Sequence, residues 1–223
     1  MGRPPRRRGG ARRPPPPRPA GRLGCRRRPA ARAPRRPPPG EPVNVSLRPV
    51  DPAADAPTIT RWVVADRASF WGMGDLGVED VAQIYGYIDE QDHLASYVFE
   101  VDAAPVGLLQ TYDPEVDEIG AFYDRRPGDV GVHLLLSDDP ARIGRTAEVL
   151  AAGFRFLTAL PGMQRLVLEP DARNEASLAL LDRLGAERGP LVDLRTSISE
   201  KPAQFYFFDR QRALDVASSG EQC

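Results

Sequence analysis

The chain has 223 residues and a formal net charge of −1, from 30 Lys and Arg against 31 Asp and Glu. Residues 1–40 hold 14 arginines and no acidic residue, so residues 41–223 carry 16 basic and 31 acidic residues, a net charge of −15. No segment approaches the roughly 18 consecutive apolar residues of a membrane helix, and Cys25 and Cys223 are too few for a disulfide framework or a metal cluster, so we expect a cytoplasmic protein with no membrane contact and no metal.

Residues 1–41 are rich in Arg and Pro, and residues 1–40 hold 12 of the 24 prolines. They lack the apolar residues needed to bury a core, so we predict a disordered, partly polyproline-like tail. No apolar run follows the paired arginines, which argues against a signal peptide. The tail is either upstream sequence translated from a start codon placed too early or a basic arm for nucleic-acid phosphates. We favour the first interpretation and expect no nucleic-acid partner.

Residues 42–213 show the periodicity of one folded domain. Alternation predicts a strand over 43–50, and residues 96–101 and 105–112 are predicted as two strands joined by a hairpin-like connection. Helical spacing predicts helices over 51–66 and 79–91. Phe70 and Trp71 lie among glycines between these helices, where they either plug the core edge or form a wall of a substrate pocket. The acidic segment 113–129 is either a solvated loop or a surface that attracts a cationic amine.

A buried central strand is predicted over residues 130–136, which are apolar apart from His133. His133 is one of only two histidines in the chain. The next strand, 165–169, ends in the carboxylate of Glu169. A histidine and a glutamate on neighbouring strand ends form a candidate general-base pair.

The remaining periodic segments predict helices over 143–160 and 174–184, a weak strand over 192–194 and a last strand over 204–208. Residues 214–223 are predicted to be a disordered C-terminal tail. Helices between strands imply an α/β fold, with a mixed central sheet covered by helices on both faces.

This order of elements resembles the GNAT acyltransferase superfamily, and the segment from Asn174 to Gly185 matches the family's last helix in its Asn and Gly. The resemblance implies acetyl-CoA or another acyl-CoA as co-substrate, because free amides at a helix N-terminus bind its pyrophosphate. It places this coenzyme on Arg142, Gly144, Arg145, Thr146, Ala147 and Asn174. The family's common Tyr, which protonates the departing thiolate, falls at Leu181, so that role is vacant or filled by another residue.

The siderophore-biosynthesis branch of this superfamily is similar through Gly131-Val132-His133 and through the run from Glu169 to Asn174. This branch includes aerobactin-type hydroxylysine acetyltransferases and mycobactin-pathway lysine acyltransferases. The resemblance implies His133 and Glu169 as the catalytic pair, with Glu replacing the more usual Asp. It implies an acyl-CoA-dependent N-acyltransferase acting on the amine or hydroxylamine of a lysine-like or diamine siderophore precursor. We expect the acceptor to contact Phe70, Trp71, Tyr112 and Asp113.

Two alternatives remain open. The first keeps the enzyme class but takes a protein N-terminus or an aminoglycoside as acceptor. The second is a non-catalytic binding module of the same fold whose basic tail contacts nucleic acid. The sequence leaves the acyl group, the N-hydroxylation of the acceptor and the oligomeric state undecided.

Overall fold

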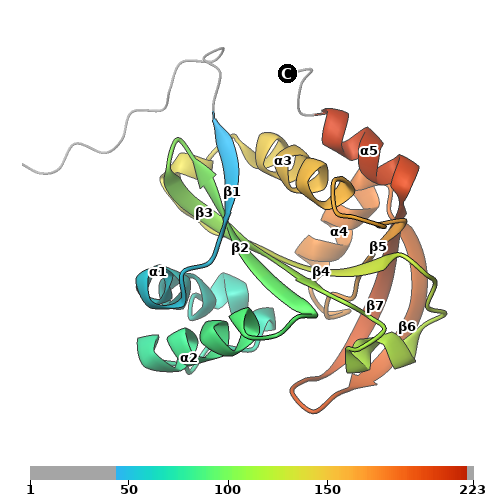
Figure 1. The fold of residues 1–223 in the computed structure, drawn as a ribbon, viewed down its shortest axis with the longest axis horizontal. Coiled ribbons are helices and arrows are strands. Elements are labelled where there is room, and N and C mark those ends of the chain that lie inside the picture. The colour runs from blue at the N-terminus through green and yellow to red at the C-terminus, as the bar shows by residue number, and fades with distance from the viewer. Residues whose placement is uncertain (1–43, 220–223) are drawn as a thin grey trace, which may run out of the picture. The chain divides into compact units, whose positions relative to one another are not determined.

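The computed structural model describes residues 44–219, and the predicted N-terminal tail lies outside the described residues. One seven-stranded sheet runs in the order β1-β2-β3-β4-β5-β7-β6 (Figure 1). Only β4 and β5 are parallel, and every other neighbouring pair is antiparallel. The strands are β1 (Val45–Pro49), β2 (Leu94–Val101), β3 (Ala104–Tyr112), β4 (Asp129–Leu136), β5 (Arg165–Leu168), β6 (Glu187–Arg195) and β7 (Glu200–Asp209).

Helices cover both faces of the sheet, as predicted (Figure 1). The helices are α1 (Pro52–Val63), α2 (Val78–Asp89), α3 (Thr146–Thr158), α4 (Glu175–Leu184), α5 (Arg210–Ser219) and the 3-10 helices η1 (Asp66–Trp71), η2 (Glu118–Phe122) and η3 (Pro140–Arg142). The first two α-helices pack on one face around Val98, Leu108 and Leu135. The last three pack on the opposite face around Leu109, Val132 and Leu166. No helix of the described part is long and apolar enough to cross a bilayer.

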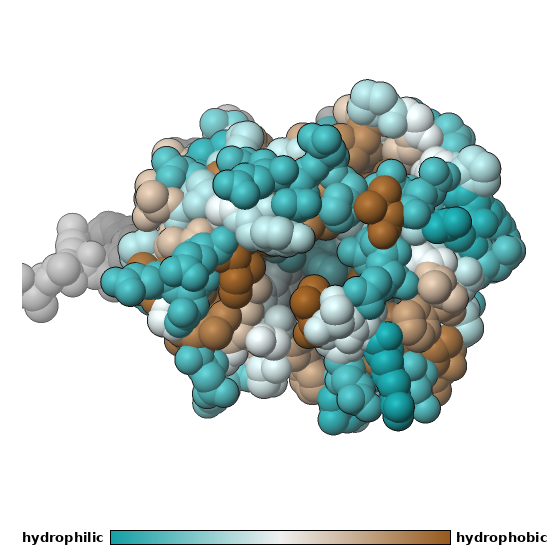
Figure 2. All heavy atoms as spheres, turned by 60° about the horizontal axis from the view of Figure 1, so that its bottom comes forward, coloured by the Kyte–Doolittle hydropathy of each residue, from teal (hydrophilic) through white to brown (hydrophobic). Residues whose placement is uncertain are grey.

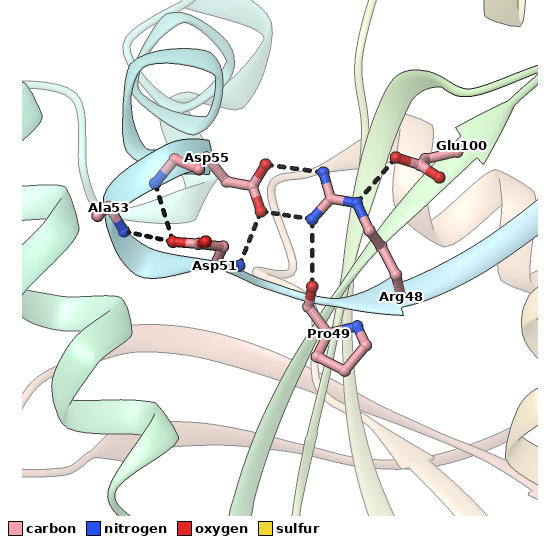
Figure 3. A network of polar contacts seen from close by, with 7 residues as sticks. Arg48, Pro49, Asp51, Ala53, Asp55 and Glu100 are labelled. Carbon is pink, nitrogen blue, oxygen red and sulfur yellow. Dashed lines mark hydrogen bonds and ion pairs between the residues drawn. The ribbon is translucent and has the colours of Figure 1, made fainter.

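Helix α1 is tied to the edge of the sheet by a cluster of charges. Arg48 on β1 donates to both carboxylate oxygens of Asp55 on α1, at 2.6 and 2.8 Å, and to Oε1 of Glu100 on β2 at 2.8 Å (Figure 3). The Arg48 guanidinium holds the pKa of Asp55 below its usual range. Asp51 begins the helix by accepting from the amides of its first turn. The cluster thus ties the start of α1 to strands β1 and β2.

Strands β4 and β5 are joined at their N-terminal ends by a buried ion pair. Arg165 Nε and Nη2 donate to the two carboxylate oxygens of Asp129, each at 2.7 Å, and Tyr123 donates its hydroxyl to the same carboxylate at 2.9 Å. Asp129 is therefore not part of a solvated acidic loop, which corrects one interpretation of segment 113–129. Its buried charge is compensated by two planar, charge-assisted hydrogen bonds.

The parallel pairing of β4 and β5 is short, since it joins only Asp129–Gly131 to Arg165–Val167. Beyond Gly131 the strand continues to Leu136 beside β3, while no strand of the described part pairs its other side. Ser137 N–H donates to the Val106 carbonyl, so odd-numbered residues of β4 exchange hydrogen bonds with β3. The backbone groups of Leu134 therefore point into the gap between β4 and β5.

Several element boundaries differ from prediction. Helix α3 begins at Thr146 rather than at 143, because Asp139 caps a separate short helix, η3, and Gly144 adopts a φ of +76° that breaks the helical path between η3 and α3. Residues 214–219, predicted as a disordered tail, belong to α5. Ala213, Val216 and Ala217 are buried against the α3 side of the core, which offsets the polar composition of this helix. The weak strand predicted over 192–194 is the C-terminal part of the longer β6.

Candidate active site

His133 and Glu169 meet where β4 and β5 separate. The Nε2 atom of His133 lies 2.6 Å from Oε1 of Glu169, which follows the last residue of β5. The His133 side chain is 36% exposed, whereas that of Glu169 is 1% exposed. Side chains alternate along β4, and Leu135 packs under α1 and α2, so His133 also points to that face. Seen from the side of α1 and α2, the surface is hollowed near its centre, and the hollow is lined by hydrophilic as well as hydrophobic residues (Figure 2).

The carboxyl group of Glu169 is ionised at neutral pH. Burial raises its pKa, but the charge and hydrogen bond of His133, the charge of Lys201 and the hydroxyl of Tyr112 together outweigh burial and lower the pKa to about 2. An ionised carboxylate only accepts hydrogen bonds, so the neutral imidazole donates Nε2–H to Glu169. The lone pair of His133 is then on Nδ1, which is the nitrogen able to accept a proton.

Tyr112 on β3 contacts both residues of the His133–Glu169 pair. Its hydroxyl donates to Oε2 of Glu169 at 2.9 Å, and its ring centre lies 5.2 Å from that of His133. Burial raises the Tyr112 pKa well above its usual value, so the hydroxyl keeps its proton. Tyr112 pairs with Gly131 across the sheet, and a Cβ at Gly131 would stand 2.0 Å from the Tyr112 ring. The glycine of the Gly131-Val132-His133 motif thus makes room for the tyrosine that supports Glu169.

Lys201 on β7 is a fourth member of this cluster that the sequence prediction missed. Its Nζ lies 3.6 Å from Oε1 of Glu169, and its side chain is 20% exposed. It is the single lysine of the chain, against 29 arginines. That rarity is the one signal by which the sequence could have drawn attention to it.

The other residues expected around the acceptor are distributed unevenly. Trp71 reaches the site, with its ring edge-on to His133 at 6.4 Å between ring centres. Phe70 is 42% exposed at the end of η1. Asp113 is exposed, and its Oδ1 accepts the amide of Glu115 at 2.8 Å. Gln110 lies directly opposite His133 on β3, which adds a polar side chain that the sequence prediction had not singled out.

The carboxylates of segment 113–129 are largely occupied by the protein itself. Asp117 accepts the amide of Ile119, and Glu118 accepts the amide of Ser197 in the β6–β7 turn. Asp113 and Asp129 have the partners described above. These contacts show a structural use of the segment, while attraction of a cationic amine stays a hypothesis.

The start of α3 offers an anion site. The amides of Thr146, Ala147 and Glu148 lie in the first turn of α3, where no carbonyl of the helix can accept their hydrogen bonds. The residue before this turn, Arg145, does not cap them with its side chain. Arg142 donates to the Ser137 carbonyl and, at 2.9 Å, to the Thr146 hydroxyl. Burial and the nearby charge of Arg67 lower the Arg142 pKa, so a second cation stands close by.

The acidic residue in this first turn, Glu148, is paired with Arg145 at 3.2 Å. The carboxylate next to the free amides is thus neutralised by the chain itself. A 13-residue helix with free amides and arginines at its N-terminus favours a phosphate group there.

Two residues of the last motif have structural partners. Asn174 begins α4 by accepting the amide of Ser177 at 3.2 Å, so its predicted coenzyme contact is not visible in the side-chain geometry. Asp171 binds the guanidinium of Arg173 at 2.6 and 2.9 Å. Leu181 is buried and supplies no hydroxyl to the site. Within residues 44–219, no group of three or more His, Cys, Asp or Glu side chains is placed to hold a metal ion.

The sequence matches known proteins over most of the described part. A family profile described as an acetyltransferase (GNAT) domain matches residues 51–194. N-hydroxyputrescine acetyltransferase of Acinetobacter baumannii is 25% identical over 121 residues, 54% of this chain and 56% of that protein. N(6)-hydroxylysine O-acetyltransferase of Escherichia coli is 30% identical over 148 residues, 63% of this chain and 45% of that protein. The chain therefore spans about half the length of these curated relatives.

Solved structures share the fold at lower identity. An uncharacterized protein from Bacillus halodurans has a TM-score of 0.70 at 19% identity, covering 79% of this chain and 90% of that one. Aminoglycoside acetyltransferase AAC(6')-Ib in complex with acetyl-CoA has a TM-score of 0.65 at 20% identity, covering 79% and 98%. At such identities the likeness establishes the fold and leaves the acceptor undecided.

Proposed function

Because the chain belongs to the acetyltransferase (GNAT) domain family, we propose that it is an acyl-CoA-dependent N-acyltransferase acting on the amine or hydroxylamine of a lysine-like or diamine siderophore precursor. The observation that carries the proposal is the His133–Glu169 pair at the gap between β4 and β5. The names of the two curated relatives, which act on N-hydroxyputrescine and N(6)-hydroxylysine, support this acceptor class.

The acyl donor would lie across the gap between β4 and β5. The free amides at the start of α3, with Arg142 and Arg145, would hold its pyrophosphate. The backbone N–H and C=O of Leu134 face the gap and would pair with the amide groups of the pantetheine arm, as a strand edge pairs with an added strand. This path leads from α3 toward His133.

His133 would serve as general base. Nδ1 takes a proton from the acceptor nitrogen as that nitrogen bonds to the thioester carbonyl carbon and the C–S bond breaks. Glu169 holds the ring with Nε2–H directed at itself and stabilises the imidazolium that forms. Leu181 offers no acid, so the proton on His133 is the one available to the departing thiolate. An N-hydroxylated acceptor is largely unprotonated near neutral pH and needs the base less than an ammonium does.

The alternatives have less support. The intact His133–Glu169 pair favours an enzyme over a binding module. The likeness to an aminoglycoside acetyltransferase is one of fold alone and does not favour that acceptor.

The test is thiol release by the full chain from acetyl-CoA, succinyl-CoA and a long-chain acyl-CoA. The acceptors are lysine, ornithine and cadaverine with their N-hydroxy forms. Turnover with a hydroxylated acceptor and a product that gives the colour of a ferric hydroxamate supports N-acylation. Silence with every pair, in a folded protein whose melting temperature coenzyme A does not raise, contradicts the proposal.

His133→Ala tests the base directly, with His93→Ala as its control because these are the two histidines of the chain. Turnover is expected to fall by about 10²- to 10⁴-fold in the first variant and to stay unchanged in the second. Equal activity of His133→Ala and the wild type would refute the assignment.

A further inference from the structure

Lys201 is the charged group of the site that the chemistry above does not use. It points to the same face of the sheet as His133, because both side chains approach the same oxygen of Glu169. The two distances, 2.6 Å for His133 Nε2 and 3.6 Å for Lys201 Nζ, place the ammonium within about 6 Å of Nε2, and the basic nitrogen Nδ1 lies across the ring from Nε2. The separation between the Lys201 ammonium and the proposed base is therefore comparable to the length of a small substrate.

The ammonium has hydrogen-bonding capacity to spare. An ammonium carries three donors, and at 3.6 Å its approach to Glu169 is an ion pair rather than a short hydrogen bond. No side-chain hydrogen bond of Lys201 within 3.5 Å occurs among residues 44–219. Its side chain is 20% exposed, so the ammonium of Lys201 is accessible to an anion while it stays beside Glu169.

The two nearby carboxylates do not cancel this capacity. Glu169 already accepts from His133 and Tyr112, and Asp171 is held by both arms of Arg173. In segment 113–129, the carboxylates of Asp113, Asp117 and Glu118 each accept a hydrogen bond from a nearby backbone amide. The two carboxylates nearest to Lys201 thus have partners of their own, and its ammonium is the group that the far end of an acceptor meets.

The residue type is informative in this chain. The other 29 basic residues are arginines, so composition alone would place arginine here as well. Lysine is a compact point charge, whereas arginine presents a wide planar fork. A compact cation fits between a buried carboxylate and a small ligand.

We propose that Lys201 binds the carboxylate of the acceptor, so that the enzyme takes N-hydroxylated ω-amino acids in preference to the corresponding N-hydroxylated diamines. This inference rests on the proposed function and decides between the acceptor classes of its two relatives. Bonds of about 1.5 Å separate the two ends of an N6-hydroxylysine by roughly 7 Å when extended. That length lets its nitrogen reach His133 while its carboxylate reaches Lys201. A diamine would instead bring its second ammonium against Lys201.

The experiment compares N6-hydroxylysine with N-hydroxycadaverine, which differ only in the carboxylate. The full chain is assayed with acetyl-CoA as wild type, Lys201→Met and Lys201→Arg. Arg195→Met is the control, because Arg195 is an exposed residue of the same β6–β7 hairpin. This substitution also removes one positive charge, but away from the site.

The wild type is expected to prefer N6-hydroxylysine in kcat/KM. In Lys201→Met, kcat/KM for this acceptor should fall by about 10- to 100-fold, mainly because KM rises, as expected for the loss of a charge-assisted hydrogen bond. Activity with N-hydroxycadaverine should stay the same or rise. Lys201→Arg should keep part of the preference, and Arg195→Met all of it.

Two results would overturn the inference while leaving the proposed function intact. One is a wild type that turns over both acceptors without preference for the carboxylate. The other is a Lys201→Met variant that loses kcat equally with both acceptors, since that is the effect of a residue that acts only through Glu169. Absence of turnover with either acceptor in the wild type would overturn the proposed function and this inference with it.

Discussion

Replacing Glu169 by glutamine is expected to disable the base while keeping the shape of the site. The carboxylate accepts from His133 Nε2 and from the Tyr112 hydroxyl. An amide that still accepts from Tyr112 through its oxygen turns its NH₂ group toward His133, and that group donates. Nε2 then becomes the acceptor and Nδ1 carries the hydrogen, so His133 presents the wrong tautomer to the acceptor.

The expected loss in kcat is about 10²- to 10⁴-fold, the usual contribution of a positioned general base. This corresponds to about 3 to 5 kcal/mol in the activation free energy, since each factor of ten is worth about 1.36 kcal/mol. The loss should be larger with lysine than with N6-hydroxylysine, because the hydroxylated nitrogen is largely unprotonated before it reacts.

The same substitution changes the acid stability in a defined direction. The folded pKa of Glu169 is lowered from 4.5 to about 2, so its ionisation stabilises the fold above about pH 4.5 and this contribution is lost as the pH falls toward 2. The full contribution is about 3 kcal/mol, at about 1.36 kcal/mol per pKa unit. Glu169→Gln lacks a titrating group, so its free energy of unfolding should fall less between about pH 5.5 and pH 3.

Two measurements check this prediction. Steady-state thiol release gives kcat for both acceptors, and urea unfolding at the two pH values gives the free energy of unfolding. Glu100→Gln is the matched control, because Glu100 is a partly buried carboxylate that pairs with Arg48 at 2.8 Å, away from His133. The reasoning is refuted if Glu169→Gln keeps wild-type kcat with lysine, or if its unfolding free energy falls with pH as steeply as that of the wild type.

Three further outcomes are expected. Arg142→Ala should raise KM for acetyl-CoA about tenfold with little change in kcat, whereas the exposed Arg61→Ala control should change neither. An unchanged KM in Arg142→Ala would contradict the proposed contact between Arg142 and the pyrophosphate. Arg165→Met should lower the free energy of unfolding in urea by about 3–5 kcal/mol, because it leaves Asp129 buried and unpaired, and a loss below about 1 kcal/mol would contradict the importance of that ion pair. Deleting residues 1–40 should leave thiol release unchanged, and a large loss would contradict the interpretation of the tail as spurious upstream sequence.

The periodic parts of the sequence predicted the fold well. The alternation in β1, the helical spacing of α3 and the apolar run of β4 follow from which faces of these elements pack against the core, and a local sequence pattern records this. The prediction failed for α5, whose small apolar residues are too few to form a clear stripe. It also misplaced the start of α3, because the conformation of Gly144 decides between continuing from η3 and beginning a new helix.

The candidate site was predicted in part. His133 and Glu169 were paired from the order of strands and from motif resemblance, and the 2.6 Å contact places them together. Their proximity follows from the short parallel pairing of β4 and β5, because each lies two residues beyond its last pair, Gly131–Val167, on the same face.

The sequence by itself determined the sheet with helices on both faces, the histidine within the buried strand and the carboxylate at the end of the next. Only the tertiary structure decided that Tyr112 supports Glu169 from β3 and that Lys201 approaches it from β7. These two residues lie 57 and 32 positions from Glu169 in the chain, and no local pattern links them to it. Strand order and the early separation of β4 from β5 bring them together, and these depend on how the whole core packs rather than on any one segment.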